Sequence, residues 1–381
     1  MSQPPITSKL LRWYARHSRD LPWRHTRDPY SIWISEIMLQ QTQVETVIPY
    51  YLRFLRRFTS VRALAEARTD EVLKMWENLG YYSRARNLHA AAKQIVARWG
   101  GRLPQNRKDL LALSGIGEYT ASAILSIAFA LPVAAIDGNV SRVISRLFAL
   151  PSPLGSPESR KQVLDLVNHL LSKKHPGAFN QAIMDLGATV CTPRAPSCLS
   201  CPLRDLCKAK DLELQEQLPV TKKRPALSHK HVTSAILLDR KKRVLVVQRP
   251  ASGLLGGLWK FPGGERGEKE ALEEALVRTV QEELGVAIRV LKAMASVKHA
   301  YTHFRVTCHV YRCAIVRGRP KSLEGREWKW VSAENLQRLA LSKAERKILA
   351  ALHSWPDVAS QLCKSSLYSG SSYRLRRKAG A

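Results

Sequence analysis

Length, composition and charge narrow the possibilities before any motif is considered. The chain has 381 residues, which at about 150 residues per domain predicts two or three domains. Its hydrophobic and charged fractions, 45% and 24%, exclude wholesale disorder. We find no apolar run long enough for a membrane span and no secretory signal, so we expect a cytoplasmic protein with no membrane partner. An excess of 61 basic over 31 acidic side chains favours a polyanionic partner such as nucleic acid.

The first half of the chain has the pattern of successive helices. Residues from Trp33 to Gln41 are predicted to share one helix, and Thr69 caps a helix that we expect to run to Leu79. Ser156, followed by a proline, begins another helix. Because the period-2 alternation of strands is absent, we predict an all-α domain over residues 1–212. A basic, proline-bracketed linker over 213–229 follows it.

The second half has a different pattern. β-Branched runs at Val232–Leu238 and Val244–Arg249 are separated by a short turn and predict a hairpin. A strong helical pattern covers Glu268–Leu284 between glycine-rich ends. We therefore predict an α+β domain over 230–355. The serine-rich, basic stretch 356–381 has no periodicity and predicts a disordered tail.

Four cysteines form a C-x6-C-x2-C-x5-C run, which is typical of a metal site in a reducing compartment. They are Cys191, Cys198, Cys201 and Cys207. Four thiolates suit either Zn²⁺ or an iron–sulfur cluster, and the spacing alone does not decide between them.

A glycine-containing turn precedes this run. Gly115 and Gly117 stand between two helical segments, within Leu113–Ala121. The backbone N–H groups at the start of the second helix would face outward and could hold an anion such as a DNA phosphate. A plain helix–turn–helix corner is the alternative.

The hairpin, Asp137 and the cysteine run together resemble the helix–hairpin–helix, iron–sulfur DNA glycosylases. That resemblance implies a [4Fe–4S] cluster held by the four cysteines. Further motifs are similar to the adenine DNA glycosylase family in particular. These motifs are Leu21-Pro22-Trp23-Arg24, Asp28-Pro29-Tyr30, Trp33 to Thr42, Gly80 to Leu88, and Asp137-Gly138-Asn139-Val140. The family removes adenine mispaired with 8-oxoguanine or guanine in double-stranded DNA, and we expect a monomeric enzyme.

Cleavage of an N-glycosidic bond produces a cationic sugar and a poor anionic leaving group, so the site needs an acid and an anion. Glu36 lies in a mostly apolar helical segment, which would raise the pKa of its carboxyl group. The resemblance implies that Glu36 protonates adenine N7 and that Asp137 stabilises the sugar cation, with Asn139 in the same catalytic motif. Tyr119 stands where strand-cutting relatives carry a lysine. A phenol forms no imine, so we expect an enzyme that only removes the base.

The target base must leave the helical stack before an acid can reach it. By resemblance, Gln41 inserts beside the estranged base, Tyr81 wedges next to the opposite guanine, and Arg24 lines the adenine pocket. These are DNA-binding predictions, as are those for the two hairpin glycines.

The second domain resembles a Nudix fold. The Nudix box has the pattern G-x5-E-x7-R-E-U-x-E-E-x-G-U, in which U is an aliphatic residue. The chain matches every defined position except one, where Thr279 replaces a glutamate. The matching residues are Gly264, Glu270, Arg278, Val280, Glu282, Glu283, Gly285 and Val286. Since box carboxylates gather Mg²⁺ around a diphosphate, this loss predicts a scaffold and not a working pyrophosphatase.

A loop in this domain is predicted to recognise 8-oxoguanine. Tyr301, Thr302 and His303 occupy the place of a Phe-Ser-His loop in the adenine glycosylase family, although an ordinary hairpin loop is the alternative. Three other functions stay open: a thymine or general mismatch glycosylase, a Nudix pyrophosphatase joined to a DNA-binding module, and a non-enzymatic DNA-binding protein with a structural cluster.

Overall fold

A computed structural model describes residues 4–221, 227–321 and 327–352. The chain divides into two compact units, one of Met1–Met75 with Arg84–Pro225 and the other of Trp76–Ser83 with Ala226–Ala381. The first is helical and the second combines helices with two sheets, which confirms the predicted fold class. The predicted tail, 356–381, lies outside the described residues, as do 222–226 within the predicted linker.

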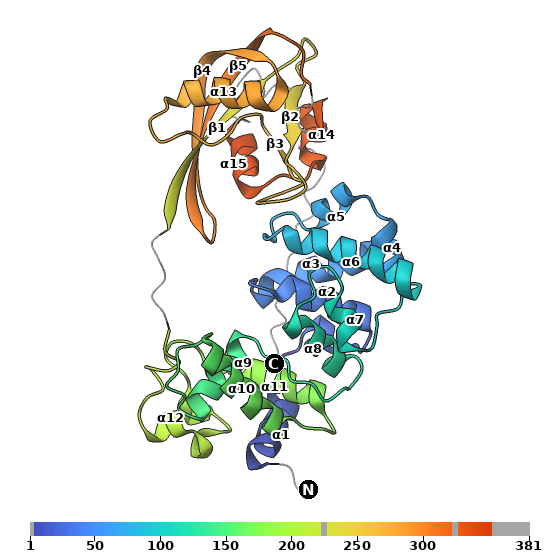
Figure 1. Ribbon diagram of the computed structural model, residues 1–381, viewed down its shortest axis with the longest axis vertical. Coiled ribbons are helices and arrows are strands. Elements are labelled where there is room, and N and C mark those ends of the chain that lie inside the picture. The colour runs from blue at the N-terminus through green and yellow to red at the C-terminus, as the bar shows by residue number, and fades with distance from the viewer. Residues whose placement is uncertain (1–3, 222–226, 322–326, 353–381) are drawn as a thin grey trace, which may run out of the picture. The chain divides into compact units, whose positions relative to one another are not determined.

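Helices make up the first unit (Figure 1). They are α1 Pro5–His17, α2 Pro29–Leu39, α3 Val44–Arg57, α4 Val61–Glu66, α5 Thr69–Met75, α6 Ser83–Trp99, α7 Arg107–Leu111, α8 Glu118–Ile127, α9 Gly138–Leu147, α10 Pro157–Leu170, α11 Pro176–Thr189 and α12 Lys208–Asp211, with short 3₁₀ turns at Pro22–Arg24, Cys198–Ser200 and Arg204–Leu206. None of the helices in the described part of the chain is long and apolar enough to cross a membrane.

The first helix of this unit packs on one that is far away in the sequence. Helix α1 lies against α11, and both contribute to one apolar core with α9 and α10. Helix α2 packs instead on α3 and α8. Side chains of α2, α8, α9 and α11 therefore reach one pocket.

Two predicted helix ends are wrong for the same reason, because the backbone turns to positive φ. Helix α2 ends at Leu39, and Gln41 has φ of 56° instead of continuing the helix. Helix α5 ends at Met75 and not at Leu79, since Asn78 has φ of 73°. The Ser156 cap is confirmed, because its side chain accepts a hydrogen bond from the Ser159 N–H.

The second unit holds two three-stranded sheets, ordered β1-β5-β4 and β3-β2-β6. The strands are β1 Ser228–Leu237, β2 Val244–Gln248, β3 Trp259–Lys260, β4 Ala287–Ala300, β5 Phe304–Arg317 and β6 Trp328–Val331, and the helices are α13 Leu272–Leu284, α14 Ala333–Arg338 and α15 Lys343–Leu352. β1 runs parallel to β5, and β4 and β5 form a long antiparallel hairpin.

The predicted hairpin of the first two strands is wrong. β1 and β2 belong to different sheets and share a single bridge, between Leu238 and Val244. The edge of β1 pairs with β5, whereas β2 pairs with β3 and β6, so the intervening turn connects two sheets. The strong helix is confirmed, but it begins at Leu272 and not at Glu268.

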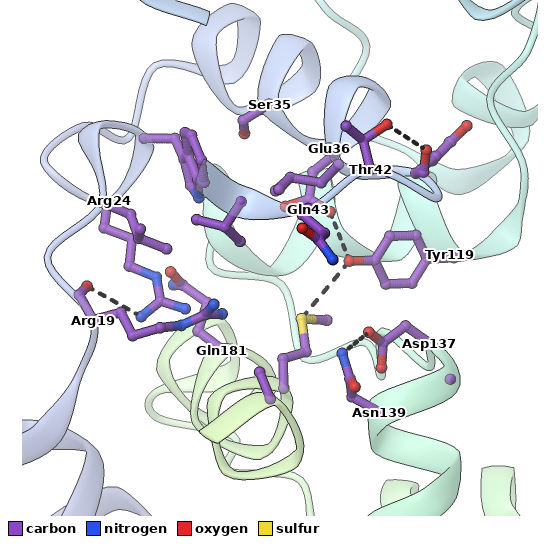
Figure 2. A pocket seen from close by; sticks show the side chains of 18 of the residues that line it. Arg19, Arg24, Ser35, Glu36, Thr42, Gln43, Tyr119, Asp137, Asn139 and Gln181 are labelled. Carbon is purple, nitrogen blue, oxygen red and sulfur yellow. Dashed lines mark hydrogen bonds between the residues drawn. The ribbon is translucent and has the colours of Figure 1, made fainter. Parts of the chain in front are cut away.

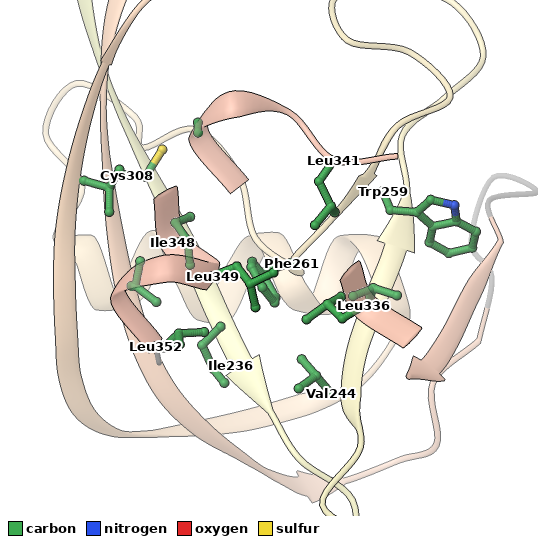
Figure 3. Close-up of a cluster of buried hydrophobic side chains, with 14 of the residues drawn as sticks. Ile236, Val244, Trp259, Phe261, Cys308, Leu336, Leu341, Ile348, Leu349 and Leu352 are labelled. Carbon is green, nitrogen blue, oxygen red and sulfur yellow. The ribbon is translucent and has the colours of Figure 1, made fainter. Parts of the chain in front are cut away.

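Apolar cores lie on both sides of these sheets. One core packs α13 against strand residues that include Leu237 and Leu245, and the other packs α14 and α15. Figure 3 shows the second core, in which Ile348 and Leu349 of α15 lie near Phe261. The layers are therefore helix, sheet, helix, and α13 packs on the strands through its apolar face.

The segment 76–83, which the sequence places in the first domain, packs within the second unit. The Glu77 carboxylate accepts hydrogen bonds from the Leu341 N–H at 3.1 Å and from Arg346 Nε at 2.8 Å. Both partners precede or lie in α15. This segment therefore brings Tyr81 to the loops of the second unit.

Candidate functional site

A pocket of about 700 Å³ in the first unit gathers all four predicted catalytic residues (Figure 2). Six of the predicted site residues line it: Arg24, Glu36, Gln41, Tyr119, Asp137 and Asn139. They come from the turn before α2, from α2 and the loop after it, and from the first turns of α8 and α9.

Glu36 is buried in the pocket wall, with 6% of its surface exposed. It is held there by α2, which begins at the Asp28 cap. Most of its neighbours on this helix are apolar, and Ser35 is the exception beside it. Burial, reinforced by the negative charge of Asp137, raises the pKa of Glu36 to about 7, although the Tyr119 hydrogen bond and Arg24 oppose the shift. A carboxyl group with such a pKa carries a proton in part of the molecules at neutral pH, as a general acid requires.

Tyr119 lies in the first turn of α8, directly after the glycine hairpin. Its hydroxyl donates to Glu36 Oε2 at 2.7 Å and lies 3.7 Å from Met184 Sδ (Figure 2). Burial and the neighbouring carboxylates raise the pKa of Tyr119 well above its usual range, so the phenol stays protonated and acts as a donor.

Asp137 caps α9 and also faces the pocket. Its carboxylate accepts hydrogen bonds from the Val140 N–H at 2.7 Å and from Asn139 Nδ2 at 3.0 Å. Burial raises the pKa of Asp137, whereas these hydrogen bonds and Arg142 favour the anion. The predicted alternative, that Asp137 is a helix cap, is therefore also true, and the cap fixes the carboxylate in the wall of the pocket.

A chain of hydrogen bonds joins Asp137 to the start of the cysteine run. Arg142 donates to Asn139 Oδ1 at 2.7 Å, to the Gly187 carbonyl at 2.7 Å and to the Cys191 carbonyl at 2.9 Å. Asn139 in turn donates to Asp137. Gly187 permits this approach, because a Cβ there would lie 2.7 Å from Asn139 Cβ.

Helix α11 supplies functional side chains that sequence reasoning missed. Asp185 is buried and binds both Arg24, through Nη1 and through Nη2 at 2.7 Å, and Arg19, through Nε at 2.7 Å. Gln181 and Met184 of the same helix line the pocket. One signal in the sequence could have revealed Asp185, since it is an acid within an apolar helical stretch. A carboxylate buried there requires a charged partner.

The hairpin between α7 and α8 is built tightly against α6. Gly115 has φ of 76°, and a Cβ there would lie 2.6 Å from the Asn87 Cβ. Gly117 is the N-cap of α8 and has open space around it. Both glycines thus keep backbone at the surface, where a phosphate could approach the helix N-terminus.

A second pocket, of about 330 Å³, lies within the second unit. Segment 78–83, residues 253–255, the loop between β4 and β5, and Lys343 line it. Tyr301 packs on Phe304 with ring centroids 4.9 Å apart, whereas Thr302 and His303 are exposed. The hydroxyl groups of Tyr81 and Thr302 are 2.5 Å apart. This pocket therefore unites Tyr81 with the three residues predicted to recognise 8-oxoguanine.

The four clustered cysteines line one further cavity together with Arg146, although no three metal-binding side chains among the described residues are arranged to hold a single metal ion. All four are half-buried free thiols. Arg146 Nη1 lies 3.4 Å from Cys191 Sγ. Burial raises the pKa of Cys201 to about 11. Four thiols that line one cavity are the kind of donor that holds an iron–sulfur cluster.

Fold and pockets define a base excision repair protein with an added Nudix domain. Residues 34–169 match the HhH-GPD superfamily base excision DNA repair protein model, and residues 233–351 match the NUDIX domain model. The human adenine DNA glycosylase is 35% identical, over 89% of this chain and 72% of its own. That of Buchnera aphidicola subsp. Acyrthosiphon pisum is 30% identical, over 92% of this chain and 98% of its own. The chain therefore belongs to the adenine DNA glycosylase family, as its motifs predict.

One solved structure bears on the thymine glycosylase alternative. A thermostable thymine-DNA glycosylase is 32% identical with a TM-score of 0.50, and covers 54% of this chain and 95% of its own. This likeness reflects the shared fold of the helical unit. The adenine DNA glycosylases extend over both units, so they define the family of the whole chain.

Proposed function

We propose that the chain removes adenine mispaired with 8-oxoguanine or guanine in duplex DNA and leaves an abasic site. The observation that carries this proposal is the buried Glu36 carboxyl, hydrogen-bonded to Tyr119 in the same pocket as Asp137. In this assignment residues 1–212 carry base excision and residues 230–355 carry recognition of the opposite base.

Glu36 is the general acid. Tyr119 donates to Oε2, so the acidic proton belongs on Oε1, from which it passes to adenine N7. Protonation turns the base into a neutral leaving group, and the resulting carboxylate can then take a proton from the attacking water. The pKa of about 7 suits both steps, since neither protonation state is rare at neutral pH.

Asp137 stabilises the sugar cation that forms as the bond breaks. Hydrogen bonds from Val140 and Asn139 orient its carboxylate and favour its charged form. A fixed negative charge beside a developing positive charge lowers the barrier with no reorganisation during the reaction. Since Tyr119 supplies no amine, the strand stays intact after adenine leaves.

Tyr81 and Thr302 recognise the base that is paired with the adenine. Their hydroxyl contact places an aromatic ring beside a hydroxyl group in one pocket. The N7 position of 8-oxoguanine carries a hydrogen and donates, whereas that of guanine accepts. A Thr302 hydroxyl that donates its own hydrogen to Tyr81 can accept from the first and has no hydrogen to give to the second. Gln41 and Arg24 complete DNA binding on the adenine side.

A [4Fe–4S] cluster on Cys191, Cys198, Cys201 and Cys207 is the proposed cofactor. Bound there, it would cross-link the loop that follows α11 and supply no step of base excision. The Arg142 hydrogen bonds to Gly187 and to the Cys191 carbonyl give that loop a direct connection to Asn139.

Single-turnover excision on A·8-oxoguanine and A·guanine duplexes tests the recognition assignment. We expect Thr302→Val to slow excision opposite 8-oxoguanine, because the mutation removes the lone pairs that accept from the 8-oxoguanine N7–H. Excision opposite guanine should stay nearly unchanged, because a hydroxyl that donates to Tyr81 has no hydrogen left for guanine N7. Ser296→Ala, which deletes another exposed hydroxyl on the same hairpin, is the control. An equal effect on both duplexes would contradict the role of Thr302.

A further inference from the structure

A lysine of the chain itself pairs with an acid at the C-terminal end of α13. Lys260, the last residue of β3, donates to Glu283 Oε1 at 2.9 Å and Oε2 at 3.0 Å, and also to the Gly263 carbonyl. Lys260 and Glu283 are 8% and 6% exposed. The ammonium group thus lies among a carboxylate and a backbone carbonyl, in a site that is nearly closed to solvent.

That donor set is the kind that divalent cations take. Mg²⁺ and Mn²⁺ prefer carboxylate and carbonyl oxygens, and Glu283 and Gly263 supply both at one point. Gly263 also donates its N–H to Glu283 at 3.2 Å, which fixes the loop against α13. The ammonium therefore occupies the position in which a bound cation would neutralise Glu283.

The neighbouring box positions offer no replacement ligand. The Thr279 hydroxyl donates to the Ala275 carbonyl of its own helix at 2.7 Å. The Thr279 methyl group packs on Gly264, where a Cβ would lie 2.8 Å away. The side chain that replaces the glutamate is therefore turned inward.

The remaining box acids pair with a guanidinium. Arg278 binds Glu270 through Nε and Nη2, each at 2.7 Å, and binds Glu282 at 3.1 Å. This pairing lowers the pKa of Glu270 to about 2. The Nudix pattern of acids implies a metal ion. In this chain, however, these carboxylates are already paired with Lys260 and Arg278, so the residues do not fit a resident metal.

We propose that the Lys260 ammonium is a built-in substitute for a divalent cation and that its removal opens a cation site at Glu283 and the Gly263 carbonyl. Lys260 neutralises Glu283 and connects the β3–α13 loop to the helix by hydrogen bonds. The second unit therefore keeps its shape in the absence of metal. The inference concerns the second unit alone and stands whether or not adenine excision is the activity.

Mn²⁺ titration of the full-length protein by calorimetry tests the proposal. We expect no Mn²⁺ bound at this site in wild type. Lys260→Met should gain one Mn²⁺ equivalent, together with a rise in melting temperature when Mn²⁺ is added. Lys260→Met with Glu283→Gln should lose both effects. Lys230→Met removes a half-buried lysine that pairs with Glu265 at 2.8 Å, and should behave as wild type.

Two results would overturn the proposal. One is Mn²⁺ binding by the wild type that Glu283→Gln abolishes. The other is a folded Lys260→Met protein with no gain of Mn²⁺. If Lys260→Met does not fold without metal, refolding in Mn²⁺ gives the same readout: recovery supports the proposal, and failure in Mn²⁺ while the double variant folds contradicts it.

Discussion

Replacing Glu36 with glutamine should strongly slow adenine excision and, at the same time, stabilise the protein at high pH. Glutamine has nearly the shape of the acid and can still accept the Tyr119 hydrogen bond through its carbonyl oxygen. It has no proton to give to adenine N7, and general acid catalysis contributes ~10²–10⁴-fold. We expect a loss of that size in single-turnover rate with mismatch binding retained.

The stability change follows from the pKa of Glu36, which burial raises from 4.5 to about 7. Below pH 4.5 the carboxyl is protonated in both the folded and unfolded chain and contributes nothing. Between pH 4.5 and 7 only the folded chain holds the proton, so the free energy of unfolding falls as pH rises. The full loss is about 3 kcal/mol, since each tenfold change in the proton affinity of a group corresponds to about 1.4 kcal/mol. Glutamine avoids this loss.

Melting temperatures of wild type and Glu36→Gln across pH 5 to 8.5 measure this difference. We expect the variant to gain over wild type as pH rises, by on the order of 6–12 °C at the alkaline end. Glu45→Gln, an exposed acid in the first turn of α3, should show no such trend. A melting difference that is independent of pH, or excision at the wild-type rate, would refute the assignment of Glu36.

Three further predictions concern the same pocket and its support. Tyr119→Lys should gain borohydride-trappable complex and strand nicking, because the amine would stand where relatives carry theirs; no gain would mean that the α8 turn does not face the sugar. Gly187→Ala should slow excision at least tenfold, since its Cβ displaces Asn139, whereas Thr189→Ala on the same helix should not; equal rates would remove Asn139 from the catalytic set. Cys201→Ser should yield protein without the brown absorbance near 400 nm of an iron–sulfur centre; an unchanged spectrum would place the cluster elsewhere.

The sequence predicted which residues share this pocket because they lie in long motifs. Glu36 and Asp137 are separated by a hundred residues, yet each motif also specifies the local structure, a buried helix for one and a helix cap for the other. The hairpin glycines were predictable for the same reason. Asp185 was not, since its role depends on how α11 packs against the turn that carries Arg24.

The other features of the fold could not be predicted, because they depend on pairing between segments that are distant in the sequence. The first two strands of the second unit have the pattern of a hairpin, but competition from β5 and β6 separates them into different sheets. Segment 76–83 packs in the second unit through contacts that include those of Glu77 and Tyr81, which no local pattern reveals. Lys260 likewise has the pattern of an ordinary strand residue until β3 is placed beside the end of α13.

Base excision by the wild-type protein across matched duplexes tests most directly whether it removes adenine opposite 8-oxoguanine and guanine. Duplexes containing A·8-oxoguanine, A·guanine, A·T and T·guanine, together with free 8-oxo-dGTP, are incubated with excess protein, and abasic product is revealed with alkali. We expect fast adenine release opposite 8-oxoguanine, slower release opposite guanine, no reaction with A·T or T·guanine, and no hydrolysis of the nucleotide. Thymine release from T·guanine, or nucleotide hydrolysis without adenine release, would contradict it.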